Sequence, residues 1–162
     1  MQYHAGEINK ALKDIKPTDA YAILAVTNVD LYPRDSWNFV YGLSCAGSGT
    51  ATFSFARYDP AFEGSGGPNR AQNWFRRSTY VMVHELTHLF GLPHCIYYEC
   101  TMNGVMNADE QIRRANYILC PICIKKLKKN IGFNVNARFN CLMEMANKLG
   151  FADEAEKYRK LI

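Results

Sequence analysis

The chain has 162 residues, of which 48% are hydrophobic and 13% aromatic, so it can bury one sizeable core but is short for two independent ones. Charged residues make up 21%, and no stretch combines low hydrophobicity with charge of one sign, which argues against disorder. The formal net charge of +4 permits a nucleic-acid or membrane partner without indicating one. We therefore expect a single domain over residues 1–162, with a sheet and helix lobe over 1–91 and a helical lobe over 92–162.

The longest apolar stretches are too short for a membrane span, and the first ten residues lack the apolar core of a signal peptide. We expect a cytoplasmic protein, with the nucleus as the alternative, and no membrane partner. Without a secretory signal, clustered cysteines are more typical of metal binding than of disulfides.

The first half of the chain predicts a helix followed by strands. Residues 4–13 have apolar side chains at helical spacing, so the chain is expected to open on a helix, and a first strand could be missing. Residues 20–29 form an apolar run typical of a central strand buried on both faces. Residues 38–45 and 50–58 alternate around a glycine-rich turn and predict two antiparallel strands, the second a candidate edge strand.

The second half predicts helices. Apolar residues at helical spacing predict a long helix over 71–90, and Gly91 follows where a residue of positive φ would end it. Further helical patterns run over 108–118, 121–130, 136–148 and 152–161. Strands first and helices last predict an α+β fold.

A histidine motif lies at the end of the long helix. His84 and His88 are four residues apart, so both imidazoles project from one face and can meet one ion. Gly91 lets the chain reverse and bring back His94 as a third ligand. Three neutral nitrogens suit a zinc ion with an open position, where bound water has its pKa lowered to about 7. Glu85 is then the candidate general base. Two helical histidines can occur by chance, but here five positions match one extended pattern.

Four of the six cysteines form a second cluster: Cys95, Cys100, Cys120 and Cys123. The two pairs have the spacing of a closed structural zinc site, in which thiolates fill all four positions. The alternatives are buried free-cysteine pairs or a redox C-x-x-C motif. Cys45 and Cys141 are expected to be ordinary buried thiols. Because His94 and Cys95 are adjacent, we expect the second metal to fix where His94 points.

The segment HELTHLFGLPHCIYYECTM, followed by CPIC, resembles the archaemetzincins, a branch of the metzincin metallopeptidases. In that family the histidine motif is joined to two cysteines, a methionine, a seventeen-residue spacer and a C-x-x-C, and residues 103–119 fit the spacer. The resemblance implies a metzincin-like zincin fold: a mixed twisted sheet with an active-site helix, plus a C-terminal helical lobe with a four-cysteine structural zinc. Met102 resembles the methionine of the turn beneath the catalytic metal, with Met106 as a rival. The resemblance also implies the same base, Glu85, and the same zinc ligands: His84, His88 and His94, and Cys95, Cys100, Cys120 and Cys123.

Three features leave alternatives open. If residues 50–58 form an edge strand above the active-site helix, an extended peptide could pair with it, whereas an interior strand has no free edge. The lysine-rich run at 125–129 is interpreted as a solvated helix face rather than a phosphate contact, so we do not expect nucleic acid. Tyr97 and Tyr98 are interpreted as packing residues rather than oxyanion donors.

Two functions are therefore weighed. The first is a zinc-dependent metallopeptidase with two Zn²⁺, one catalytic and one structural, that acts on a peptide or protein substrate. The second is a two-zinc module that binds protein or nucleic acid on an inactive peptidase scaffold. An intact Glu85 favours the first, because a purely structural site has no use for a base at that position.

Overall fold

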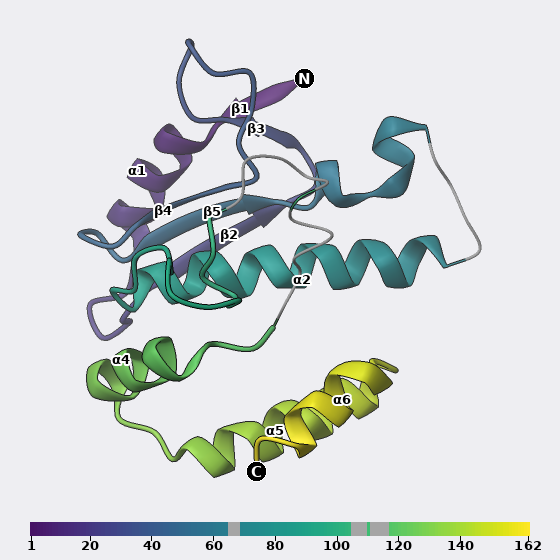
Figure 1. Ribbon diagram of the computed structural model, residues 1–162. Coiled ribbons are helices and arrows are strands. Elements are labelled where there is room, and N and C mark those ends of the chain that lie inside the picture. Colours follow the sequence, from purple (N-terminus) through teal and green to yellow (C-terminus); the bar gives the residue numbers. More distant parts are fainter. Residues whose placement is uncertain (65–68, 105–109, 111–116) are drawn as a thin grey trace.

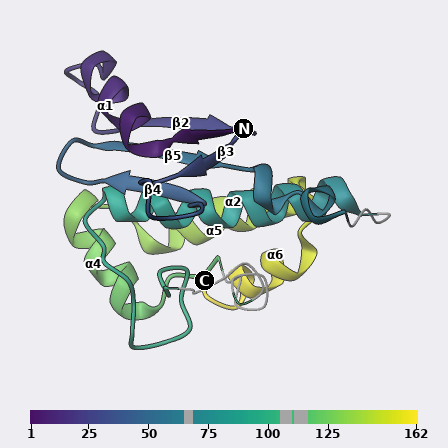
Figure 2. The same ribbon diagram turned by 90° about the horizontal axis from the view of Figure 1, so that it is seen from above.

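The computed structural model describes residues 1–64, 69–104, 110 and 117–162. Its elements stack in layers: one helix, a sheet, the long helix, and further helices on the far side of the long helix (Figures 1 and 2). In that order the helices are α1 (Ala5–Ile15), α2 (Arg70–Leu89), α4 (Pro121–Ile131), α5 (Val135–Lys148) and α6 (Ala152–Arg159).

The sheet between α1 and α2 is mixed. Within the described residues its strand order is β2 (Ile23–Thr27), β5 (Thr50–Ser54) and β4 (Gly42–Cys45). Strands β2 and β5 run parallel, whereas β4 and β5 run antiparallel with Gly42 opposite Phe53. The expected mixed sheet above an active-site helix is thus present.

One prediction about strand position is wrong, and one open alternative is decided. The predicted central strand, β2, lies at an edge and leaves half of Val26 exposed, whereas the candidate edge strand, β5, is central and buried throughout. Polar side chains of β5 are tolerated there because they are paired: Thr52 Oγ1 donates to Asn9 Oδ1 of α1 at 2.8 Å. Strand β5 is also shorter than predicted, since residues 56–58 form a 3₁₀ turn.

The chain does not open on a helix. Strand β1 (Gln2–His4) comes first and pairs in parallel with β3 (Asp30–Tyr32). His4 then caps α1, with its Nδ1 accepting a hydrogen bond from the backbone N–H of Glu7 at 3.1 Å. A strand of three residues is too short to show a period of two, which is why the sequence pattern missed it.

Helix α2 matches its predicted range within one residue at each end. Its buried side chains include Tyr80, Val81 and Leu89, and it packs against β4 and β5. Gly91 has φ +83°, as the sequence predicted, so the chain can turn back after the helix without a Cβ clash.

The C-terminal helices also lie where they were predicted. Most of the predicted helix 108–118 lies outside the described residues, and its last two residues, 117 and 118, are not helical. Helices α5 and α6 pack together around Phe139, Ala146 and Tyr158. Arg76 of α2 forms an ion pair with the buried Glu154 of α6, which fixes this pair of helices against the outer side of α2. The division into one domain with two lobes stays a prediction. No helix in the described ranges combines the length and apolarity needed to cross a membrane.

Candidate metal centres

Three of the four histidines converge at the C-terminal end of α2. The ring centroids of His84, His88 and His94 lie 4.7 to 5.3 Å apart, and one nitrogen of each ring lies within 4.8 Å of the others. The helix supplies His84 and His88 from one face, and the reversal at Gly91 returns His94. The predicted three residues are therefore brought together.

Backbone carbonyls fix the tautomers of two of these histidines. Nδ1 of His84 lies 2.7 Å from the carbonyl oxygen of Thr101, and Nδ1 of His88 lies 2.6 Å from that of Leu92. A carbonyl oxygen only accepts, so each Nδ1 donates and each Nε2 of the neutral ring carries a lone pair. The two Nε2 atoms lie 3.0 Å apart. Two lone pairs at that distance repel unless they share a cation, so this donor set fits a metal ion.

Burial also favours the metal-binding form of the rings. It lowers the pKa of His84, which is 8% exposed, and it lowers the pKa of His94 as well. Both rings are thereby kept neutral near pH 7, and a neutral imidazole is the form that binds metals.

Two residues outside the turn that carries His94 affect its position. Asn130 of α4 donates from Nδ2 to the carbonyl oxygen of Phe90 at 2.7 Å. A Cβ at Gly104 would lie 3.1 Å from Nδ1 of His94, so only a residue without a side chain leaves that ring its full space. Asn130 thus fixes the start of the turn, and Gly104 leaves room for the His94 ring.

Glu85 lies beneath strand β4. Ser44 of β4 donates from Oγ to Oε2 of Glu85 at 2.5 Å, and the same Oγ lies 3.1 Å from the backbone carbonyl oxygen of Glu85. The cleft between β4 and the turn after α2 has a volume of about 520 Å³, and its lining includes Gly42, Ser44, Glu85, His88 and His94. A carboxylate and a group of imidazoles thus face one cleft, as a hydrolytic centre requires.

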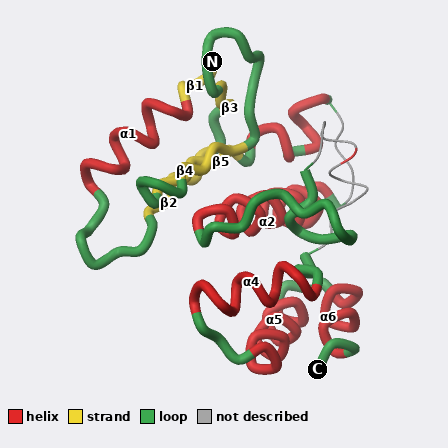
Figure 3. The backbone as a smooth tube through the Cα atoms, turned by 60° about the vertical axis from the view of Figure 1, so that its left-hand side comes forward, coloured by secondary structure: helices red, strands yellow, loops and turns green. Residues whose placement is uncertain are grey.

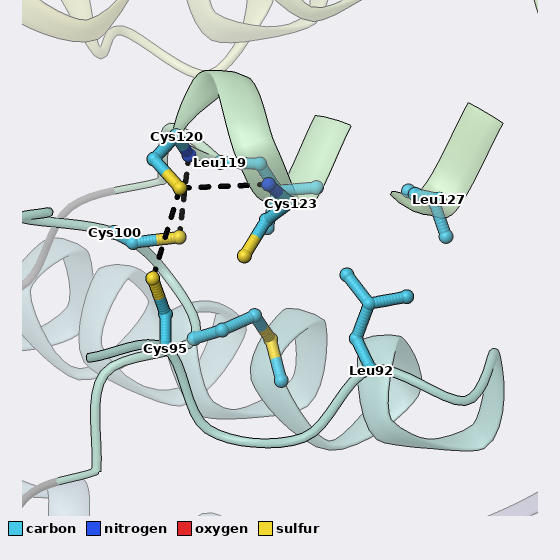
Figure 4. Packing of buried hydrophobic residues seen from close by; sticks show 8 residues of the cluster. Leu92, Cys95, Cys100, Leu119, Cys120, Cys123 and Leu127 are labelled. Atoms are coloured by element: carbon cyan, nitrogen blue, oxygen red, sulfur yellow. Dashed lines mark hydrogen bonds between the residues drawn. The ribbon is translucent and has the colours of Figure 1, made fainter. Parts of the chain in front are cut away.

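The four predicted cysteines form a second, fully buried cluster. Their sulfur atoms all lie within 4.8 Å of one another, and Figure 4 shows Cys120 and Cys123, from the start of α4, facing Cys95 and Cys100. Sγ of Cys95 and Sγ of Cys120 lie 3.7 Å apart, well beyond the roughly 2.05 Å of a disulfide. These thiols are therefore gathered without being bonded to one another.

Backbone amides point at these sulfurs. The N–H of Cys120 donates to Sγ of Cys100 at 3.2 Å, and the N–H of Cys123 donates to Sγ of Cys120 at 3.5 Å. Such donors stabilise thiolates, the form of cysteine that binds metals. The C-x-x-C at the N-terminus of α4 therefore has the local geometry of a zinc knuckle.

The pKa values of the cysteines differ in direction. Burial raises the pKa of Cys100 and that of Cys123. Burial also acts to raise the pKa of Cys95, but hydrogen bonds from the backbones of Tyr97 and Tyr98 and from the neighbouring thiols bring it down to about 7. Four buried sulfurs cannot all ionise without a cation, so a divalent metal fits this cluster as well.

The two clusters are connected through the segment between Cys95 and Asn103. Thr101, which accepts from His84, directly follows Cys100, and the N–H of Cys95 donates to the carbonyl oxygen of Met102 at 2.7 Å. Asn103 closes the loop: its Nδ2 donates to the carbonyl oxygen of Cys95 at 2.8 Å, and its Oδ1 accepts from the N–H of Cys100 at 2.8 Å. One loop therefore carries two cysteines of the second cluster and the carbonyl that orients His84 of the first.

The remaining predictions have mixed outcomes. Cys45 and Cys141 are exposed, so the expectation that both are buried is wrong. Cys45 is the last residue of β4, and Cys141 lies on α5. Met102 is fully buried against the cysteine cluster, whereas its rival Met106 lies outside the described residues.

Two tyrosines of the loop do not pack as predicted. Tyr97 is 59% exposed and Tyr98 is 58% exposed, so their interpretation as packing residues is wrong. Nζ of Lys126 lies 5.8 Å from the ring centroid of Tyr97, on the side of α4.

Sequence reasoning missed two participants. Ser44 lies 41 residues from Glu85 and belongs to no recognisable motif. The carbonyl of Thr101 is a backbone group and so has no residue signature, although its position one residue before the predicted Met102 was a usable signal.

The sequence model of Peptidase family M54 matches residues 1–129. Archaemetzincin-2 of Rattus norvegicus is 40% identical over 167 residues, covering 89% of this chain and 46% of the relative. Archaemetzincin-1 of Homo sapiens is 32% identical over 167 residues, covering 88% of this chain and 33% of the relative. The chain thus spans about half the length, or less, of these relatives.

Solved structures of related proteins are also similar to this chain. The crystal structure of an archaemetzincin from Methanopyrus kandleri has a TM-score of 0.66 and 28% identity, covering 82% of this chain and 67% of that chain. A zinc-dependent peptidase from Methanocorpusculum labreanum has a TM-score of 0.59 and 30% identity, covering 75% of this chain and 68% of that chain. The similarity therefore extends to three dimensions.

Proposed function

Because this chain belongs to peptidase family M54, we propose that it is a zinc-dependent peptidase whose catalytic zinc is held by His84, His88 and His94. The resemblance to archaemetzincins predicted from the sequence is confirmed, and so is the α+β fold shared with their structures. The chain spans about half of its relatives, so the activity and the residue roles are our proposals.

One observation carries the proposal. The Nε2 atoms of His84 and His88 face each other at 3.0 Å while backbone carbonyls accept from both Nδ1 atoms. This arrangement is unfavourable for two free imidazoles and favourable for two ligands of one ion. Nitrogen ligands that leave an open coordination position are typical of catalytic zinc.

Zinc, when bound at this centre, supplies a Lewis acid that polarises the scissile carbonyl and lowers the pKa of water. Glu85 accepts the proton of the attacking water and passes it to the departing amine nitrogen. We assign no side chain the role of nucleophile, so no acyl-enzyme forms. The cleft beside Glu85 holds the substrate chain in place during both proton transfers.

The second proposed zinc is structural. Cys95, Cys100, Cys120 and Cys123 supply four sulfurs, which fill a tetrahedral site and leave no position for water. We propose that Met102 lies in the turn beneath the catalytic centre, consistent with its burial beside this cluster. Peptides or proteins are the proposed substrates, nucleic acid is not a proposed partner, and the cytoplasm remains the expected location.

Strand β4, rather than β5, offers the edge at which a peptide can pair. Within the described residues β4 is the last strand on its side of the sheet, and it lies beside α2 (Figure 3). The N–H of Ser54 donates to the carbonyl oxygen of Tyr41 at 2.9 Å. Because antiparallel pairing alternates, the main-chain groups of Gly42 and Ser44 point away from β5 and are available to an extended peptide.

Pairing with β4 predicts sensitivity to the substrate's main chain. N-methylation of a substrate amide that pairs with Gly42 or Ser44 is expected to slow cleavage by about 10-fold, because one hydrogen bond and the close approach are lost. A scan of singly N-methylated peptides by mass spectrometry measures this. If N-methylation at every position near the scissile bond left the cleavage rate unchanged, pairing with β4 would be contradicted. Peptides methylated near their ends serve as the control.

Metal removal tests the proposed function. Incubation with a chelator is expected to abolish cleavage of a peptide library, and Zn²⁺ but not Mg²⁺ is expected to restore it, because nitrogen and sulfur donors prefer zinc. The number of zinc ions per chain is measured in parallel. His94→Ala is expected to lose the zinc of the histidine cluster, whereas His4→Ala, outside that cluster, is expected to keep it. Two bound zinc ions with no cleavage of any peptide would instead favour the binding-module hypothesis. Fewer than two bound zinc ions per parent chain would contradict the proposed ligands.

A further inference from the structure

We propose that Ser44 is a positioning residue for Glu85 and that Gly42 provides the space this requires, so that β4 holds the base as well as the substrate. The inference rests on the proposed peptidase function. It concerns the side-chain face of β4 rather than its main-chain edge.

The contact between Ser44 and Glu85 is specific in its atoms. A serine hydroxyl has one proton, and Oγ of Ser44 lies 2.5 Å from Oε2 of Glu85 and 3.1 Å from its backbone oxygen. The shorter contact is to the charged acceptor, and hydrogen bonds to carboxylates are the stronger ones. Ser44 therefore binds one oxygen of the carboxylate and leaves Oε1 for the proton transfers.

Gly42 lies two residues earlier, on the same face of β4. A Cβ at this position would lie 2.9 Å from Cγ and 3.3 Å from Cδ of Glu85. Its φ is not positive, so backbone conformation gives no reason for a glycine here. The reason is space: any side chain at position 42 would displace the carboxylate that Ser44 holds.

The arrangement determines the direction of the base. A glutamate on a helix has several rotamers, and each places the carboxylate differently relative to the imidazoles. Ser44 selects one of them from across the cleft, and Gly42 permits it. Catalysis depends on such positioning, because a displacement of about 1 Å can cost about 100-fold in rate.

Kinetics of Ser44 variants give the first test, on a fluorogenic peptide chosen from the library. Ser44→Ala is expected to reduce kcat by about 10- to 100-fold while KM stays within about twofold, because the base is misdirected and substrate binding is unchanged. Ser44→Thr retains a hydroxyl and is expected to restore most of kcat. Ser48→Ala is the matched control, since Ser48 lies in the same hairpin and donates to the carbonyl oxygen of Cys45 at 3.2 Å. An unchanged kcat in Ser44→Ala, or no rescue by threonine, would overturn the proposal.

Unfolding gives a second test that does not depend on activity. The loss in urea midpoint caused by Ser44→Ala is expected to shrink by at least half in a Glu85→Ala background, because the carboxylate contact is already absent. If Ser44→Ala lowered the urea midpoint equally in the parent and in Glu85→Ala, the proposed contact between the two side chains would be overturned. If the parent protein cleaves no peptide, the proposed function fails, and this double-mutant cycle alone decides whether Ser44 holds Glu85.

Discussion

Glu85→Ala is expected to leave both metal clusters loaded with zinc and to reduce peptide cleavage by about 10²- to 10⁴-fold. The change removes the proposed base and keeps every proposed ligand, since the metal-binding candidates within the described part of the chain are the three histidines and the four cysteines. Loss of rate without loss of metal therefore isolates the proton transfers from metal binding.

The measurement compares zinc content and cleavage rate for the parent and the variant under identical loading. Glu144→Ala is a matched control, because Glu144 is an exposed glutamate on α5 and outside the cleft. It is expected to behave like the parent in both respects. A Glu85→Ala variant that cleaves at the parental rate would remove Glu85 from the mechanism, and one that loses zinc would show that its role includes shaping the histidine cluster.

The parts of the site that sequence alone predicted are those with local patterns. His84 and His88 meet because four residues make about one helical turn, and Gly91 ends α2 because only glycine readily takes φ +83°. The C-x-x-C is equally local, since the N-terminus of α4 itself directs Cys120 and Cys123 to one point. Each of these inferences needs fewer than a dozen consecutive residues.

The errors concern partners that are distant in the sequence. The apolar run over 20–29 predicted a buried central strand, but strand order depends on which elements pack on each side, and β5 took that place. The same limitation concealed Ser44, because nothing in its neighbourhood of the chain identifies Glu85 as its partner. The sequence pattern predicts that a strand exists, but it does not predict which strands lie beside it.

Cys120→Ala is expected to have the largest effect on the whole molecule. It removes one of the four buried sulfurs, so the remaining three lose metal affinity and repel one another when ionised. Structural zinc contributes about 10–16 kcal/mol of apparent binding energy in zinc-finger peptides, so even partial loss outweighs most single side-chain contacts. We expect a lower urea midpoint and less than one structural zinc per chain. Cys141→Ala, at an exposed cysteine, is the control and is expected to change neither.

The same variant is expected to weaken zinc binding at the histidines by about 10- to 100-fold, the range seen when groups behind metal ligands are removed. The reason is the loop between Cys95 and Asn103, because a displaced Cys100 moves the Thr101 carbonyl that orients His84, and a displaced Cys95 moves His94. Asn103→Ala tests this link without removing a candidate ligand, since among the described residues its side chain bonds to Cys95, Tyr98 and Cys100. It therefore remains informative even if Cys120→Ala does not fold. Zinc titration of both variants measures how strongly the cysteine cluster affects zinc affinity at the histidines. If both variants bound zinc at the histidines as tightly as the parent, the two centres would be independent despite their shared loop.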